Sequence, residues 1–599
     1  MKIKVSDYIA DFFAKNEITD VFTVTGGGAM HLNDSFGHHP ELHCTYQHHE
    51  QACAMAAEGY TRLSGKTSVL CVTTGPGGTN ALTGVMGSWL DSIPVFVISG
   101  QEKYITTIKS SDVPLRQLGF QEFNIIDCAK TMTKYATMVI DKNSICYELE
   151  KALYIARSGR TGPVWLDIPL DVQAATIETD ELKHFIPEEK NVTIESSDIE
   201  FILSKIKNSK RPVILAGNGI RLGNAVADFR ELVEKLRLPV VTAWNAHDIL
   251  PDNNKYFCGR PGTIGTRGGN FVVQNADLLL SIGCRMGLRQ IGFAWEQFAK
   301  NAYKIAVDVD YAELNKKTVK NDKKIVCNSK DFINACLNAD YSTGAQHSEW
   351  LDWCTNINKK YPVVQSEYYK KQSPVNPYVF FKKLSNHIDE NDVTIASNGT
   401  ACVCALQVIE LKNNQRMFTN AGASSMGYGL PAAIGAAIYH KDEGHIICLE
   451  GDGSIQMNLQ ELQTVIHNKF DIKIFWLNNN GYQSIRFSQT GYFKAKERGY
   501  CGVDAESGLS FPSAKKIANA YGIKYYKIDS HKDLDKNLKK IMVDKKPCIC
   551  EVVLDINQQF APKSSSKILP DGKMISAPLE DMAPFLPEEE LASNMIANK

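Results

Sequence analysis

Oxygen-bearing side chains follow two apolar stretches of the chain, where they could hold a metal ion and a diphosphate. Asp452 stands between Gly451 and Gly453, and 25 residues separate Gly453 from Asn479. Mg²⁺ prefers oxygen ligands in octahedral geometry and commonly shares them with phosphate groups. Asp452 and Asn479 offer side-chain oxygens. Gly481 can offer its carbonyl, because a glycine permits the tight turn that this requires.

Two strands and a helix must position these residues. Apolar stretches over 445–449 and 472–477 predict strands, and the spacing over 459–466 predicts a helix between them. Ligands bind at the carboxyl ends of parallel strands, and a helix N-terminus there favours anions. A lone Asp-Gly turn is common and carries little information. Here the next predicted strand ends in three asparagines at 478–480, which makes a Mg²⁺–diphosphate site the better interpretation.

The same alternation of short apolar runs and helical patterns continues along most of the chain. It predicts an α/β fold with three doubly wound parallel-sheet domains at 1–185, 198–340 and 375–556. We expect a charged linker over 178–197 and an extended tail over 557–599. A chain of 599 residues is too long for one core. Further strands are predicted over 68–72, 95–98, 162–169, 212–216, 239–241, 278–282, 304–309, 393–396 and 548–553.

Composition excludes several classes of protein. Apolar residues make up 44% and charged residues 22%, with a formal net charge of −1. This balance predicts neither a nucleic-acid nor a membrane partner. We find no signal-peptide pattern and no apolar run long enough to span a bilayer. The sixteen cysteines show no zinc-like or disulfide spacing, so a cytoplasmic location with reduced thiols is predicted.

The spacing of Asp452 and Asn479 resembles the motif that binds thiamine diphosphate (ThDP). Over roughly residues 1–560 the chain resembles the acetolactate synthase group of ThDP enzymes. The order would be a pyrimidine-binding domain, a central Rossmann-like domain and a diphosphate-binding domain. The resemblance implies ThDP and Mg²⁺ as cofactors, with the metal on Asp452, Asn479 and Gly481. Matching segments of the first domain are 49–51, 56–60, 73–80, 91–94, 98–101 and 120–122.

The resemblance also implies roles on both sides of the cofactor. Glu50 would share a proton with the aminopyrimidine ring, which lets the cofactor lose its C2 proton. Met426 would be the apolar wedge between the two rings, and Gln121 a further catalytic residue. Thr400 and Ala401 replace the Gln-His pair usual in the group. The other implied cofactor contacts are Gly26, Gly27, Pro76, Asn80, Asn398, Gly399, Thr400, Ser425, Gly451, Gly453, Ser454 and Tyr482.

The central segment resembles the FAD site of the same group. Glycines after strands admit a diphosphate, arginines pair with it, and an acidic residue can bond a ribose hydroxyl. Gly287 stands where the group often has Asp, and a central domain without a nucleotide is the alternative. The implied FAD contacts are Gly217, Thr242, Gly283, Arg285, Arg289 and Asp308. In the group, facing subunits complete each active site, so a homodimer or homotetramer is implied.

The implied reaction is decarboxylation of a 2-keto acid such as pyruvate, followed by addition to a carbonyl acceptor. Ser488 aligns with a Trp on which acceptor selectivity in the group depends, so the pocket is expected to be more open and more polar. His31 is either structural or bonds a hydroxylated substrate or relays a proton. Segments 26–34 and 579–585 resemble a subgroup of surface-sugar biosynthesis. We therefore predict acetyl transfer from pyruvate, with a ketosugar nucleotide as a candidate acceptor.

Three alternatives stay open. An ordinary acetolactate synthase would join pyruvate to a second 2-keto acid. A non-ligating decarboxylase or FAD-linked oxidase would release aldehyde or peroxide. A catalytically silent homologue is the third, and the presence of Glu50, Asp452 and Asn479 together argues against it.

Overall fold

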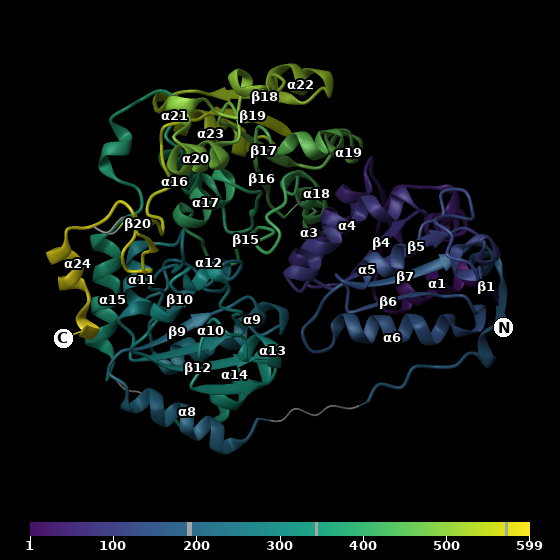
Figure 1. Ribbon diagram of the computed structural model, residues 1–599, viewed down its shortest axis with the longest axis horizontal. Coiled ribbons are helices and arrows are strands. Elements are labelled where there is room, and N and C mark those ends of the chain that lie inside the picture. Colours follow the sequence, from purple (N-terminus) through teal and green to yellow (C-terminus); the bar gives the residue numbers. More distant parts are fainter. Residues whose placement is uncertain (189–193, 342–345, 442, 569–572, 599) are drawn as a thin grey trace.

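Three parallel sheets organise the chain (Figure 1). The structure is a computed structural model that describes residues 1–188, 194–341, 346–441, 443–568 and 573–598. Each sheet is the centre of one α/β domain, as the sequence predicts. Within the described ranges, no helix is both long enough and apolar enough to cross a membrane.

The first domain has a six-stranded sheet in the order β3-β2-β4-β5-β7-β6, with every pair parallel. Its strands are β2 (Asp20–Thr23), β3 (His43–Tyr46), β4 (Ser68–Val72), β5 (Val95–Gln101), β6 (Tyr135–Met138) and β7 (Val164–Pro169). Its helices are α1 (Val5–Lys15), α2 (Met30–His38), α3 (Glu50–Ser64), α4 (Pro76–Leu90), α5 (Ile125–Ala129), α6 (Ile145–Arg157) and α7 (Leu170–Ala174). Short antiparallel strands β1 (Lys2–Lys4) and β8 (Thr176–Glu178) tie the chain start to the beginning of the expected linker.

The third domain repeats this topology with the order β15-β14-β16-β17-β19-β18. Numbered within its own domain, each sheet runs 2-1-3-4-6-5. Its strands are β14 (Val393–Ala396), β15 (Arg416–Phe418), β16 (Ile446–Gly451), β17 (Ile472–Asn478), β18 (Lys524–Ile528) and β19 (Cys548–Val553). Its helices are α16 (Pro377–His387), α17 (Thr400–Val408), α18 (Gly429–His440), α19 (Leu462–Asn468), α20 (Gln483–Phe493), α21 (Ala495–Arg498), α22 (Ala514–Ala520) and α23 (Leu534–Val543).

The central domain has a five-stranded parallel sheet in the order β10-β9-β11-β12-β13. Its strands are β9 (Pro212–Ala216), β10 (Val240–Thr242), β11 (Leu278–Ile282), β12 (Tyr303–Asp308) and β13 (Lys323–Val326). Its helices are α8 (Ser196–Asn208), α9 (Gly219–Leu222), α10 (Val226–Leu236), α11 (Arg267–Gln274), α12 (Leu288–Ile291), α13 (Tyr311–Leu314), α14 (Ser329–Asn338) and α15 (Ser348–Lys360). The core of this domain continues past residue 340, because Trp350 and Ile357 of α15 are buried in it.

Both faces of the sheets are covered, which explains the nearly continuous apolar strands. Successive side chains of a strand point to opposite faces. In β16, Ile447 and Leu449 join one buried cluster, whereas Ile446 and Cys448 join another on the opposite face. A one-residue shift of the strand would still leave apolar side chains on each face. The apolar pattern therefore does not specify the register of a strand, and pairing with the neighbouring parallel strands must do so.

The C-terminal tail packs on the central domain, at the left of Figure 1. It contains a hairpin of β20 (Ser566–Ile568) and β21 (Met574–Ser576), followed by α24 (Glu588–Asn594). Leu579 and Met595 are buried in the central core. Arg267 of α11 donates to the carbonyl of Pro584 at 2.6 Å, which fastens the tail to this domain.

In all three sheets the strand order reverses between two adjacent strands: β2 and β4, β9 and β11, and β14 and β16. Such switch points form crevices at the carboxyl ends of strands, where ligands of α/β proteins bind. The glycine-containing segments singled out from the sequence follow these strands in each domain. The topology therefore brings the candidate site residues to three crevices.

Candidate active site

The loop after β16 and the loop after β17 are joined through Asp452. One carboxylate oxygen of Asp452 accepts from the backbone N–H of Gly453 at 2.9 Å, and the other from that of Gly481 at 3.1 Å. The side chain is buried, and burial raises the pKa of this carboxyl to about 6. A cation beside Asp452 would offset the cost of keeping a buried carboxylate ionised. Asn479, the first residue of the loop after β17, is also buried.

Arg486 of α20 organises the loop that carries Asn479. Its guanidinium donates to the carbonyls of Asn479 at 3.1 Å and Asn480 at 2.9 Å. It also forms an ion pair with Asp504 at 3.2 Å. Gly481 has a φ of +139°, and a Cβ there would lie 2.4 Å from the carbonyl oxygen of Val503. Both the arginine and the glycine are therefore needed for this loop conformation.

The segment after Gly453 differs from the helix predicted over 459–466. Residues 455–461 form a 3₁₀ helix with a kink at Asn458, and the α-helix begins only at Leu462. Asn458 leaves the helical conformation because its side chain donates to the carbonyl of Gly427 at 2.8 Å and to Gln51 at 3.2 Å. These tertiary bonds override the helical spacing of the sequence. The expected α-helix N-terminus next to Asp452 is therefore absent from this part of the described chain.

The loop after β14 offers a hydroxyl without a partner. Gly399 has a φ of +57°, and α17 begins at the next residue. Thr400 is buried, and its hydroxyl oxygen has no hydrogen-bond partner among the described residues. Buried polar groups are normally satisfied. A phosphate oxygen at the start of α17 would satisfy this one, so the threonine fits a diphosphate despite the missing Gln-His pair.

Ser454 and Asn398 hold neighbouring backbone segments together. The Ser454 hydroxyl lies 3.0 Å from that of Ser397 and accepts from the N–H of Gly427 at 2.9 Å. Asn398 donates to the carbonyl of Ser424 at 3.2 Å. The half-buried residues Ser425 and Met426 lie in the segment between these two bonds. Met426, which is expected to separate the two rings of the cofactor, therefore lies close to the loops that carry Asn398 and Ser454.

Tyr482 closes the space above Gly453. A Cβ at Gly453 would lie 2.2 Å from the Tyr482 ring. At Gly451 the space is open, because the nearest atom would be 3.9 Å from a Cβ, so the loop backbone is accessible at Gly451 and covered by Tyr482 at Gly453.

In the first domain, Glu50 is the first residue of α3 and is 8% exposed. Its carboxylate accepts from the side-chain amide of Asn80 at 3.0 Å. Gly26 and Gly27 follow β2, and Pro76 begins α4 after β4. These residues therefore meet at the switch point of the first sheet.

His31 and Gln121 lie near the same crevice. His31 is half-buried in the first turn of α2. Gln121 is exposed and has a φ of +60°, and its carbonyl would lie 2.2 Å from a Cβ at Gly75. Within this one chain, the Gln121 side chain faces solvent.

The two halves of the candidate site belong to domains that touch through α3 and α18 (Figure 1). Glu461 accepts from the N–H of His48 at 3.0 Å and from the Gln47 side chain at 3.3 Å. No hydrogen bond or ion pair between described residues joins Glu50 to Asp452 or Asn479. One chain therefore contains both halves of the candidate site, and no direct bond between described residues connects the carboxyl groups of Glu50 and Asp452.

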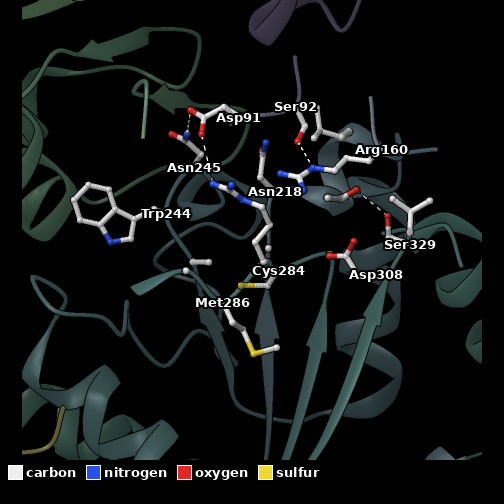
Figure 2. A pocket seen from close by; sticks show the side chains of 18 of the residues that line it. Asp91, Ser92, Arg160, Asn218, Trp244, Asn245, Cys284, Met286, Asp308 and Ser329 are labelled. Carbon is white, nitrogen blue, oxygen red and sulfur yellow. Dashed lines mark hydrogen bonds and ion pairs between the residues drawn. The ribbon is translucent and has the colours of Figure 1, made fainter. Parts of the chain in front are cut away.

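A cavity of about 440 Å³ lies at the switch point of the central sheet (Figure 2). Five of the six residues implied for FAD line it: Gly217, Gly283, Arg285, Arg289 and Asp308. A Cβ at Gly217 would lie 2.1 Å from the carbonyl of Gly283, so this close approach requires glycine. The sixth, Thr242, is buried and bonds His247 at 3.1 Å, and its neighbours Ala243 and Trp244 line the cavity instead.

The first domain supplies part of the wall of the central cavity (Figure 2). Arg160 donates to Ser92 at 2.9 Å and forms ion pairs with Asp310 and Glu313, each at 2.9 Å. Sequence reasoning missed Arg160, because it lies in a loop of one domain and faces another. The volume of the cavity and its lining arginines Arg160, Arg285 and Arg289 fit a diphosphate-bearing nucleotide.

Comparisons with known proteins agree with this architecture. Three family models match: "Thiamine pyrophosphate enzyme, N-terminal TPP binding domain" over residues 3–126, "central domain" over 199–336 and "C-terminal TPP binding domain" over 397–552. Thiamine pyrophosphate is another name for ThDP. The matched ranges correspond to the three sheets in order.

Whole-chain relatives extend the match. The chain is 30% identical to the acetolactate synthase large subunit of Lactococcus lactis subsp. lactis (strain IL1403), covering 90% of this chain and 91% of that protein. It is 30% identical to the acetolactate synthase isozyme 1 large subunit of Escherichia coli (strain K12), covering 93% and 95%. Identity to acetolactate synthase 1, chloroplastic, of Nicotiana tabacum is 28%, covering 93% and 83%. The chain therefore belongs to the ThDP-dependent enzymes, in their acetolactate synthase-like group.

Proposed function

We propose that the chain is a carboligase that decarboxylates pyruvate or a similar 2-keto acid and adds the remaining acyl unit to a carbonyl acceptor. The observation that carries this proposal is that the chain contains two preformed polar sites, one in the first domain and one in the third. Glu50 is buried at the start of α3 with Asn80 as its partner, and Asp452 joins the loops after β16 and β17. A binding protein would not need both.

Some residues of the chain would bind the metal and the cofactor, and others would control the proton at the pyrimidine ring. Asp452, Asn479 and the carbonyl of Gly481 would hold Mg²⁺, and Thr400 and Ser454 would face the diphosphate. Glu50 would hold a proton at the pyrimidine ring, and Met426 would support the bent cofactor. ThDP supplies the electron sink for decarboxylation when it is bound. Gln121 and His31 would then contact the substrate side of the crevice.

Two acceptors are candidates. The named activity of the relatives supports the first, a second 2-keto acid that would give acetolactate from pyruvate alone. Ser488 supports the second, a bulkier acceptor such as a ketosugar nucleotide. It is exposed on α20 and leaves open the space that an indole would fill. Its hydroxyl already donates to the carbonyl of Ser484 at 3.1 Å, so Ser488 favours a larger acceptor more than a more polar one.

FAD in the central cavity and a homo-oligomer complete the proposal. Gly217 and Gly283 leave room for a diphosphate, while Arg285 and Arg289 supply positive charge. Exposed apolar side chains lie next to both halves of the site, including Phe120 at 80% exposure and Tyr492 at 65%. Large exposed apolar groups often mark interaction surfaces. A second copy covering them would support an active site shared between subunits.

The test is product analysis with carbon-labelled pyruvate. Purified protein with ThDP and Mg²⁺ should release labelled CO₂ and form a ligated product. Pyruvate alone tests acetolactate formation, and pyruvate with equimolar 2-ketobutyrate and ketosugar nucleotides tests the acceptor. Asp452→Ala is the inactive control. Acetaldehyde or peroxide as the main product would contradict the carboligase proposal. Acetolactate that dominates in every mixture, unchanged by Ser488→Trp, would reject the bulky acceptor.

A further inference from the structure

Three potential metal ligands converge on the outer side of the first domain, away from the three crevices. Cys146 and Glu150 lie one turn apart on α6, and His184 comes from the chain just after the short turn at Thr179–Glu181. The ligand atoms of the three residues all lie within 4.8 Å of one another. Spacing along the chain does not reveal this cluster, because 33 residues separate Glu150 from His184.

The contacts of His184 argue for a metal rather than for a nucleophilic triad. Its Nδ1 lies 3.5 Å from the Cys146 sulfur and 2.8 Å from a Glu150 carboxylate oxygen. A Cys–His–Glu relay needs the thiol and the carboxylate on opposite ring nitrogens, so that the proton can pass across the ring. Here both groups meet the same nitrogen. When Nδ1 carries no proton, three electron-pair donors face one another, an arrangement that a cation would satisfy.

We propose that Cys146, Glu150 and His184 form a Zn²⁺ site. Zinc takes sulfur at about 2.3 Å and imidazole nitrogen at about 2.0–2.1 Å, which places the two ligand atoms roughly 3.6 Å apart in a tetrahedron. The observed 3.5 Å between Cys146 and His184 matches this spacing. The contact between His184 and Glu150 must open by roughly 0.5 Å, which the exposed imidazole permits. Water or a small anion would supply the fourth ligand.

The ligand set distinguishes this site from the Mg²⁺ site proposed at Asp452. A thiolate is a soft ligand that selects zinc and disfavours magnesium. Burial raises the pKa of the Cys146 thiol, which also faces Tyr8 and Glu150. Zinc binds the thiolate form of cysteine, so zinc binding would release the thiol proton.

The position of the cluster indicates what zinc would do. Glu150 also accepts from the N–H of Phe185 at 2.7 Å, and the Phe185 ring packs 5.6 Å from the rings of Tyr147 and Tyr154 on α6. His184 and Phe185 open the segment that leads from the first domain to α8 of the central domain. Zinc would fasten the start of this segment to α6, which is a structural role separate from catalysis.

Zinc binding to the full chain tests the inference directly. Metal-free protein is reloaded with ThDP and saturating Mg²⁺, then titrated with Zn²⁺ against a chromophoric chelator. We expect one zinc per chain, with affinity lowered at least about tenfold in both Cys146→Ser and His184→Ala. Co²⁺ in place of zinc should give a thiolate charge-transfer absorption that Cys146→Ser removes. Protease cleavage near residue 185 should slow when zinc is added.

Matched variants decide the outcome. Cys501→Ser removes an exposed thiol elsewhere, and His38→Ala removes an exposed imidazole that also contacts a carboxylate, 3.2 Å from Asp34. Both should bind zinc like the parent. The His184 side chain is 68% exposed, so its replacement leaves the core intact even if Cys146→Ser folds poorly. Equal zinc affinity in parent and His184→Ala would overturn the proposal. If zinc bound at Asp452 instead, Cys146→Ser and His184→Ala would both keep the zinc affinity of the parent, which would also overturn the proposal.

Discussion

The carboxylate of Asp452 accepts the backbone N–H of Gly481 at 3.1 Å, across 29 residues of sequence. This bond fixes the end of β17 to the end of β16, so Asp452, Asn479 and the carbonyl of Gly481 stand at one edge of the sheet.

Asp452→Ala is predicted to abolish Mg²⁺-dependent ThDP binding while the fold remains. Asp452 is the only carboxylate in the proposed metal set, and Mg²⁺ sites normally contain at least one. Calorimetric titration of ThDP with and without Mg²⁺ measures this effect. Asp555→Ala is the control, since Asp555 follows neighbouring β19 and pairs with Lys371 at 2.7 Å. Unchanged ThDP affinity in Asp452→Ala would mean that the metal binds elsewhere.

Glu50→Gln is predicted to keep ThDP binding but to slow hydrogen–deuterium exchange at C2 of the bound cofactor by about 100-fold or more. Glutamine preserves the size of the side chain and can still accept from Asn80, but it cannot exchange a proton with the pyrimidine. Nuclear magnetic resonance after acid quench measures the exchange. The exposed Glu41→Gln serves as a control. Exchange at the parental rate in Glu50→Gln would remove Glu50 from the proposed chemistry.

Thr400→Val is predicted to raise the dissociation constant of ThDP by roughly 10- to 150-fold, because a hydrogen bond to a charged group contributes about 1.5–3 kcal/mol. The unliganded protein should keep its stability, since the hydroxyl has no partner among the described residues. Thr400→Ser retains the hydroxyl and should bind ThDP nearly as well as the parent. If valine and serine at this position behave alike in the titration, the hydroxyl does not contact the cofactor.

Arg486→Lys is predicted to weaken Mg²⁺ binding several-fold, roughly 3- to 10-fold, without unfolding the chain. A guanidinium can reach the carbonyls of Asn479 and Asn480 together with Asp504, whereas an ammonium has no such fork. The Mg²⁺ dependence of ThDP binding measures the loss, with the exposed Arg498→Lys as the control. Because Arg486 acts through the loop, saturating Mg²⁺ should restore most of the activity. If saturating Mg²⁺ did not restore the activity of Arg486→Lys, Arg486 would have a direct role in the reaction.

His445→Gln is predicted to flatten the dependence of thermal stability on pH above about pH 6.5. The hydrogen bond that His445 donates through Nδ1 to the Asp471 carboxylate at 2.7 Å raises the pKa of His445, and its Nε2 lies 2.7 Å from the carbonyl of Met542. Lys473 opposes this shift, while Asp392 adds to it.

The sign of the effect follows from the raised pKa. A raised folded-state pKa gives stability that is fully present below the unfolded value of about 6.5 and is lost as pH rises through the folded value. Melting temperatures from about pH 5.5 to 8.5 should therefore converge between parent and variant as pH rises. His38→Gln, at an exposed site, should leave the parental profile unchanged. A constant difference across this range would show that the charge of His445 is not involved.

Strands were the part of the fold that local sequence could predict. The strands at 68–72, 212–216, 278–282, 393–396 and 548–553 have the predicted bounds, because buried parallel strands are apolar on both faces and end at turn residues. The helix after Gly453 was predicted too early, since helical spacing cannot register the bond from Asn458 to Gly427. Short strands with polar residues, such as β3, also gave too weak a pattern.

By itself, the sequence determined the family, the order of the three domains and the types of residue available for chemistry. Those features depend on residues close together in the chain. Only the tertiary structure decided which distant residues meet, such as Arg160 with Asp310 and His184 with Cys146. It also decided that the Thr400 hydroxyl has no hydrogen-bond partner among the described residues. Contacts of this kind arise when domains and loops pack, and their distances depend on every element between them. That is why spacing along the chain predicted the Asp452 motif but not the wall of the central cavity or the cluster on α6.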